Sequence, residues 1–452
     1  MLSVPLLKNR PMKRLLIYMS VVSLFGIVGF SPAFAKQDGT LHIEKDNPKI
    51  ITLEKAVANA LLKNPTLSAH SLEKRVREAR TLQSGLLPNP RLEVNVDDAL
   101  GSGPFNGFDR SETTVQVGQL IELGGKRGAR ENANRIAERV ADKTYESKRL
   151  DILTDVNKAF VEVLSSQNKV KLTEELIELG DKFFNAVGER VKAGKVAPIE
   201  QTKAGVTLST FKIEMAHAKL ELKQARRKLS STWGNAEPQF VSVTGNFFKI
   251  YPVPLLESLQ NKGVETPYLE RWKSEQERRQ AMVELERANG TPDVTIKGGY
   301  RRLDESNDNA VTFGISIPLQ IFNRNQGAIA EAQHRLAKVQ QERRAAELKI
   351  NQNFLEAYQS LVLAHSQAST LQSEIVPAAQ LAFDGVNEGY RFGKFGFLDV
   401  LDSQKTLFHT QELYLSALAE YHKAIAEVHR LTNGFKFYDR IPVSSKNMEN
   451  DK

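Results

Sequence analysis

The chain has 452 residues, of which 41% are hydrophobic and 26% charged, with no cysteine and a formal net charge of +8. Its mean hydropathy of −0.37 excludes a transporter built from membrane-spanning helices, each of which needs about 20 apolar residues. The apolar fraction is too high for a disordered chain, and the lack of cysteine excludes disulfides, thiolate metal sites and thiol nucleophiles. With only 8 histidines as well, the composition favours a long, polar, helical scaffold over an enzyme.

The N-terminal segment has the pattern of an export signal. Lys13 and Arg14 precede an apolar run over 15–30, which a Ser-Pro pair ends just before Ala33-Phe34-Ala35. A basic region, an apolar region and a small-residue site predict a signal peptide over 1–35; a membrane anchor is the alternative, but the run is short for one. Removing this segment takes away four basic residues and no acid, which lowers the net charge from +8 to +4 and weakens a nucleic-acid interpretation.

The remainder of the chain contains a unit of about 200 residues that occurs twice. At an offset of 202 residues, Pro65 matches Pro267 and Arg77 matches Arg279. Further along, at an offset of 199 residues, Gly194-Lys195 matches Gly393-Lys394. Each offset holds over tens of residues, and a repeat of this length is too long for a solenoid. The pattern therefore indicates a tandem duplication.

Each copy combines a short stretch of strands with very long helices. Strict alternation of apolar and polar residues predicts two strands in each copy and four in all, over about 91–100, 112–121, 293–302 and 310–319. Apolar residues at spacings of three and four predict long helices over about 129–190, 198–233, 328–388 and 397–432. The fold class is therefore mainly α with a small β part, built from a duplicated helix–hairpin–long helix–helix unit.

The same patterns divide the chain into five segments. They are the signal peptide at 1–35, a first repeat at 36–234, an inter-repeat segment at 235–265, a second repeat at 266–434 and a polar tail at 435–452.

Four amphipathic strands cannot form a complete structure in lipid. Every backbone polar group there must be paired, so strands span a membrane only as closed barrels, and single-chain barrels begin at about eight strands. Other copies of the chain would have to supply the missing strands. The alternative is a small soluble hairpin domain that caps the helices.

Four segments, in order along the duplicated chain, resemble a known family over residues 50–434. They are Leu87-Pro88-Asn89-Pro90, the run 318–327 (PLQIFNRNQG), Gly389-Tyr390-Arg391-Phe392-Gly393, and the run 119–127 (QLIELGGKR). Together they resemble the TolC family of outer-membrane efflux channels, and the run 119–127 looks most like its cobalt–zinc–cadmium resistance branch.

The resemblance implies a homotrimer whose 12-stranded outer-membrane β-barrel continues into a 12-helix periplasmic α-helical barrel. It also implies a periplasmic adaptor (membrane fusion protein) and an inner-membrane RND-type pump as partners, besides outer-membrane lipid. We expect a passive exit duct of a tripartite efflux system, for divalent heavy-metal cations. A duct for drugs or type I secretion is one alternative, and a soluble exported coiled-coil scaffold is another. We expect no enzymatic activity, cofactor, resident metal or nucleic-acid partner.

The candidate aperture residues are Asp399 and Asp402, which lie one helical turn apart on one helix face. In a trimer each would form a ring of three charges, and acidic rings select cations. The family's closed aperture looks similar, with acids and a tyrosine at the positions of Asp399, Asp402 and Tyr390. The alternative is that the two aspartates only cap or solvate the start of their helix.

Two turns are the candidate adaptor-docking sites, Gly194-Lys195-Val196 and Gly393-Lys394-Phe395. Each glycine would permit the chain reversal, and the nearby apolar residue would contact the adaptor. His422 and His429 share a helix face but make an incomplete metal site, so we interpret them as packing or lumen-lining residues.

Overall fold

The computed structural model describes residues 50–263 and 266–432, all of which belong to one contact unit, Asn47–Lys452. The expected signal peptide and polar tail lie outside the described residues. The first copy contains β1 (Ile50–Ile51), α1 (Leu53–Lys63), α2 (Pro65–Ser84), β2 (Arg91–Asp97), the 3₁₀ turn η2 (Gly103–Phe105), β3 (Glu112–Ile121), α3 (Lys126–Lys192) and α4 (Pro198–Ser231). Next come β4 (Ser242–Val243), α5 (Leu256–Gly263), α6 (Pro267–Asn289), β5 (Val294–Leu303), β6 (Asp308–Ser316), α7 (Gln326–Thr370), the π-helical turn η3 (Leu371–Ile375), α8 (Val376–Arg391) and α9 (Phe397–Leu431).

Helices α2 and α6 correspond to each other in the two copies, and both begin at a proline, whose missing N–H is not needed at that position. In the first copy, the Asn64 side chain accepts a hydrogen bond from the Leu67 N–H at 2.9 Å and so caps α2. The same side chain donates to the Thr232 carbonyl oxygen at 2.7 Å. One buried amide therefore starts α2 and fixes it to the end of α4.

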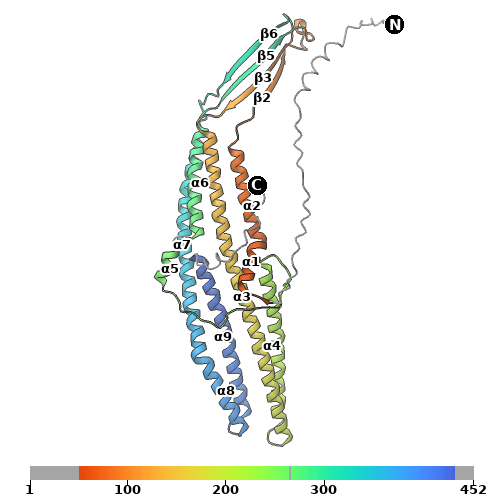
Figure 1. Cartoon of the computed structure of the whole chain (residues 1–452), viewed down its shortest axis with the longest axis vertical. Coiled ribbons are helices and arrows are strands. Elements are labelled where there is room, and N and C mark those ends of the chain that lie inside the picture. Colours follow the sequence, from red (N-terminus) through yellow and green to blue (C-terminus); the bar gives the residue numbers. More distant parts are fainter. Residues whose placement is uncertain (1–49, 264–265, 433–452) are drawn as a thin grey trace, which may run out of the picture. The chain divides into compact units, whose positions relative to one another are not determined.

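Two long helical stretches span most of each copy. Helix α3 has 67 residues, which corresponds to about 100 Å. It packs against α2, α4, α6 and α9 (Figure 1). None of the helices in the described ranges combines the length and the apolar character needed to cross a bilayer. The mainly helical fold with a small β part confirms that part of the predicted fold class.

The four long strands form one antiparallel sheet in the order β2-β3-β5-β6, in which they lie side by side (Figure 1). The central pair joins the two copies, because β3 pairs with β5 from Glu112↔Leu303 to Ile121↔Val294. Each outer strand, β2 or β6, pairs on one side only within the described part of the chain. Helix α3 starts five residues after β3 ends, so the sheet and the α3–α4 turn lie at opposite ends of α3.

The two faces of this sheet differ in chemistry. The registers place the alternating apolar residues on one face, where they are exposed, and Phe313 is the extreme at 87%. This apolar face contains Leu92, Val94, Val96, Val115, Val117, Ile296, Tyr300, Val311, Phe313 and Ile315. On the opposite face Lys297 pairs with Glu93 at 2.7 Å, and Arg301 pairs with Glu112 at 2.8 Å.

Two local features differ from the sequence expectation. The described residues contain a further short pair of strands, β1 and β4, which are parallel and have two residues each. Such strands are too short to produce an alternating pattern. The long helix expected over 328–388 also contains the π-helical turn η3, where the Val376 N–H bonds to the Leu371 carbonyl. Pro377 follows directly, and since proline lacks an N–H and crowds the preceding turn, it accounts for a local change of helix geometry here.

The inter-repeat segment is fixed to the helices by buried polar contacts. The Tyr421 hydroxyl accepts from the Tyr251 N–H at 2.8 Å and donates to the Tyr251 carbonyl at 3.0 Å. His422 contacts the Phe247 carbonyl oxygen through Nε2 at 2.8 Å, and burial lowers the pKa of its imidazole. His422 is therefore a packing residue in this chain.

A second polar cluster joins the two copies. The Tyr268 hydroxyl of α6 donates to Asp151 of α3 at 2.5 Å and accepts from Arg430 of α9 at 3.0 Å. Glu427 pairs with Arg430 and, at 2.6 Å, with Lys158. Burial raises the pKa of Glu427, but the two basic partners outweigh burial and the net shift is downward. The carboxylate form, which holds α3 to α9, is therefore favoured.

Candidate functional site

The two copies end in helix hairpins with the same turn geometry. Gly194 joins α3 to α4 and Gly393 joins α8 to α9, with φ angles of +73° and +75°. These left-handed conformations favour glycine, which carries no Cβ. The following residue closes each turn, because the Lys195 N–H bonds to the Arg190 carbonyl at 2.9 Å and the Lys394 N–H to the Gly389 carbonyl at 2.8 Å. The duplicated sequence thus produces two matching reversals.

The side chains at the two turns differ in exposure. Lys195 and Lys394 are exposed, and Val196 is half-buried. Phe395 is 46% exposed, since its ring packs against Gly389, where a Cβ would overlap it. The most exposed aromatic residue at the second turn is Phe392, at 74%. Phe392 is therefore a candidate contact residue in addition to those expected from the sequence.

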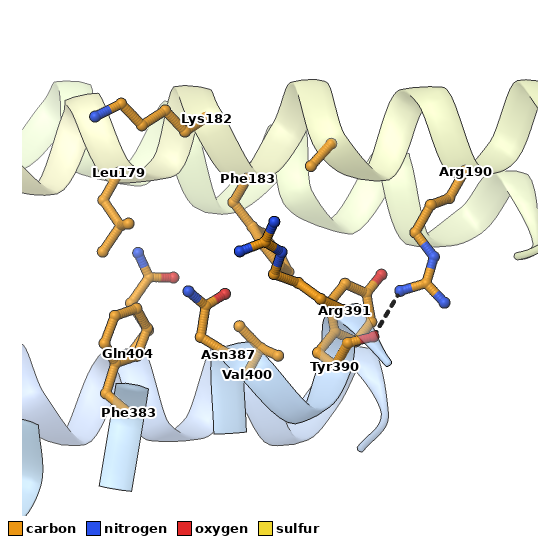
Figure 2. Close-up of a pocket in the computed structure, with 11 residues that line it drawn as sticks. Leu179, Lys182, Phe183, Arg190, Phe383, Asn387, Tyr390, Arg391, Val400 and Gln404 are labelled. Carbon is orange, nitrogen blue, oxygen red and sulfur yellow. Dashed lines mark hydrogen bonds between the residues drawn. The ribbon is translucent and has the colours of Figure 1, made fainter. Parts of the chain in front are cut away.

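Tyr390 points away from its own turn toward the other hairpin. It is 5% exposed, and its ring lies 5.7 Å from that of Phe183 on α3, centroid to centroid. The guanidinium of Arg190 lies 4.3 Å from the Tyr390 ring centroid, and its Nη1 donates to the Tyr390 carbonyl oxygen at 3.0 Å (Figure 2, dashed line). Phe397 of α9 stacks on Phe183 with a centroid separation of 5.5 Å.

We call Phe183, Arg190, Tyr390 and Phe397 the hairpin latch, because these four side chains hold the α3–α4 hairpin against the α8–α9 hairpin. A cation over an aromatic ring contributes about 0.5–2 kcal/mol, and an aromatic pair about 0.5–1.5 kcal/mol. Burial raises the pKa of the Tyr390 phenol, and the nearby Arg190 opposes this only in part. The phenol therefore stays neutral around pH 7.

The two candidate aperture acids lie elsewhere. Asp399 and Asp402 are both exposed, and no hydrogen bond or ion pair within residues 50–263 and 266–432 joins either of them to Tyr390. Asp399 accepts a hydrogen bond from the Gly396 N–H at 2.7 Å and so caps α9. The capping role considered for Asp399 is thus present, and it leaves the second carboxylate oxygen available at the surface.

The run 119–127 forms a joint between sheet and helices. Arg130 binds both carboxylate oxygens of Glu122, at 2.7 and 3.1 Å. Lys126 pairs with Asp293 at 2.6 Å, and a Cβ at Gly124 would lie 2.5 Å from the Thr291 hydroxyl oxygen. Glu122 therefore joins the end of β3 to α3, and Lys126 joins α3 to Asp293, the residue before β5. The run has an architectural function here, whatever its resemblance to one branch of a family.

Sequence reasoning missed Arg190 and Phe183. The repeat alignment places Tyr390 opposite Val191, so identity between the copies gives no signal for Arg190. A basic residue one turn before a glycine reversal is the only local sign of it. No group of three or more potential ligand residues able to hold a metal occurs among the described residues.

The chain resembles known outer-membrane proteins both in sequence and in fold. The family described as "Outer membrane efflux protein" matches residues 56–235 and 263–434. "Cobalt-zinc-cadmium resistance protein CzcC" of Cupriavidus metallidurans is 36% identical over 381 residues, which are 84% of this chain and 90% of the relative. "Outer membrane protein TolC" of Escherichia coli is 22% identical over 389 residues, 80% of this chain and 78% of the relative. The open state of the Neisseria gonorrhoeae MtrE outer membrane channel aligns with a TM-score of 0.71 at 19% identity, over 84% of this chain and 88% of that one.

The hairpin latch can be tested by amide hydrogen exchange of the purified protein. Replacing Arg190 by Gln removes the cation from the Tyr390 ring, so we expect residues 386–396 to exchange roughly 5- to 30-fold faster. Replacing Arg190 by Lys keeps the charge but loses the flat stacking group, and should give an intermediate rate.

Lys192→Gln is the matched control for these variants. Lys192 ends the same helix but only forms an exposed ion pair with Glu189 at 2.9 Å, so its loss should leave exchange unchanged. Equal exchange in Arg190→Gln and the unaltered protein would contradict the latch.

Proposed function

The chain belongs to the outer membrane efflux protein family, and we propose that the cargo of this channel is a divalent heavy-metal cation such as zinc, cobalt or cadmium. It is an outer membrane efflux channel with a periplasmic helical extension, and its family is not enzymatic. The observation that carries the cargo proposal is the 36% identity with a relative named for cobalt, zinc and cadmium resistance. Two further relatives, at 23% and 25% identity, are named for nickel and cobalt resistance.

Three copies of the chain are proposed to form the channel. The sheet has four long strands, an exposed apolar face and an outer strand on each side that pairs only once in the described ranges. A closed barrel in lipid needs every backbone group paired and the apolar face outward. Twelve strands from three copies satisfy both conditions, with Glu93, Glu112, Lys297 and Arg301 facing the lumen. The helices of three copies would then form the twelve-helix periplasmic barrel.

The proposed domain arrangement follows the duplication. The family matches two separate stretches, and these fit a first repeat over 36–234 and a second over 266–434, with an inter-repeat segment over 235–265. In this arrangement the segment containing Tyr251 surrounds the helices midway along their length.

The hairpin turns are the proposed docking sites for a periplasmic adaptor, which would connect the channel to an RND-type pump in the inner membrane. They lie at the end of α3 that is farthest from the sheet. Gly194, Lys195 and Val196 form one contact surface, and Gly393, Lys394 and Phe395 form the other, to which the exposed ring of Phe392 adds apolar area.

Asp399, Asp402 and Tyr390 are the proposed aperture residues. Threefold symmetry would place three copies of each exposed aspartate around the axis, which favours cations over anions. Tyr390 would act differently, by holding α8 against α3 through Arg190. Opening of the aperture then requires the hairpin latch to loosen.

Deleting the gene tests the cargo. We expect the deletion strain to become roughly fourfold or more sensitive to zinc, cobalt or cadmium, because cations that reach the periplasm through the pump have no exit. Sensitivity to a panel of organic toxicants should not change, and a plasmid copy of the gene should restore growth. Increased sensitivity to organic compounds alone would refute the metal proposal and favour a drug duct.

Removing the charge at the aperture tests the proposed acid rings. The double variant Asp399→Asn with Asp402→Asn keeps an oxygen acceptor for the Gly396 N–H, so α9 should remain capped. In planar bilayers we expect the cation-to-anion permeability ratio to fall roughly twofold or more.

Asp384→Asn is the matched control, since Asp384 is an exposed aspartate on α8 that accepts from Gln380 at 2.9 Å. An unchanged permeability ratio in the double variant would refute the assignment of both aspartates to the aperture.

A further inference from the structure

A pocket of about 430 Å³ lies between the two hairpins, just beside the hairpin latch (Figure 2). Its walls come from α3 on one side and from α8 and α9 on the other. The volume is within the range of pockets that bind small molecules. Apolar side chains form much of its lining: Leu179, Phe183, Ala186, Phe383 and Val400. The remaining lining residues are Tyr390 and a set of polar or basic side chains.

The charged side chains that line the pocket are all basic: Lys182, Arg190 and Arg391. Lys182 is compensated by Glu178, at 2.6 Å on the same helix. Arg190 and Arg391 form no ion pair within the described ranges 50–263 and 266–432. Figure 2 shows Arg391 extending from α8 into the space between the hairpins, alongside Phe183. Two guanidinium groups therefore face one small space without a carboxylate to pair with.

A buried amide in the same pocket also lacks a partner. Gln404 is 2% exposed, and its Nε2 donor has no hydrogen-bond partner within the described ranges. Leaving such a group unpaired in a buried site is unfavourable. The amides of Gln404 and Asn387 point into the same space (Figure 2). Glu200 of α4 interacts electrostatically with Tyr390 but does not line the pocket.

We propose that this pocket binds an organic carboxylate with a compact apolar body, such as an aromatic acid. Arg391 and Arg190 would pair with the carboxylate, which suits the planar, two-pronged guanidinium. The unpartnered Gln404 amide would donate to it, and Phe183, Phe383 and Val400 would contact the apolar body. The ligand is an anion and therefore differs in charge from the proposed cationic cargo.

Binding would also affect the hairpin latch. Arg190 lines the pocket and at the same time donates to the Tyr390 carbonyl. A carboxylate competes for the same guanidinium, and a charged acceptor binds it more strongly than a carbonyl does. The occupied pocket would therefore replace the direct contact of Arg190 with Tyr390 by a carboxylate bridge between Arg190 of α3 and Arg391 of α8.

In the test, the full-length protein in detergent is titrated with 1-naphthoate, and binding is measured by isothermal titration calorimetry. We expect saturable binding at one site per chain, and no binding of 1-naphthylmethylamine, which has the same ring with a positive charge. Arg391→Gln should weaken 1-naphthoate binding about tenfold, because an ionic hydrogen bond is lost. Asn387→Asp, which adds a negative charge at the pocket wall, should abolish it.

Arg344→Gln is the matched control, an exposed arginine on α7 outside the pocket, and it should bind 1-naphthoate as the unaltered protein does. Amide exchange confirms that each variant retains its fold. Failure of the unaltered protein to bind 1-naphthoate, equal binding of the amine, or unchanged affinity in both Arg391→Gln and Asn387→Asp would overturn the proposal. None of these outcomes depends on which cargo the channel exports.

Discussion

The unpaired backbone of the outer strands is the constraint on which the rest of this structure depends. Strands β2 and β6 each pair on one side only in the described part of the chain, and the sheet between them exposes an apolar face. Lipid provides no hydrogen-bond partner for a free N–H or C=O group, so both edges must be closed by other strands. The described residues of this chain contain no further long strand that could pair with these edges. In the proposed assembly, closure by neighbouring copies would determine the barrel, the helical extension that continues from it and the position of the aperture.

The duplication explains how one chain can build a structure with approximate internal symmetry. Pairing of β3 with β5 joins the copies within the sheet, and the Tyr268–Asp151–Arg430 cluster joins them among the helices. At the far end the copies differ, because Arg190 comes from one hairpin and Tyr390 from the other. Matching turns with different side chains give two hairpins that share a geometry but make unequal contacts. The asymmetry lies at the proposed aperture.

Periodicity in the sequence was sufficient to predict a mainly helical fold with a small β part, because both patterns extend over many residues. Val115 and Val117 alternate with polar neighbours within β3, and their register then fixes the exposed apolar face. The β1–β4 pair is too short to leave such a pattern, and the π-helical turn depends on one proline within a long apolar repeat. The contact of Arg190 with Tyr390 joins residues 200 positions apart on different helices. No local rule predicts a contact of that kind.

The most direct measurement is a cryo-electron microscopy reconstruction of the full-length protein extracted from membranes. We expect three copies around one axis and a closed barrel of twelve strands, in which β2 of each copy pairs with β6 of the next. A barrel closed within a single chain, or a sheet whose two edges remain open, would contradict the assembly.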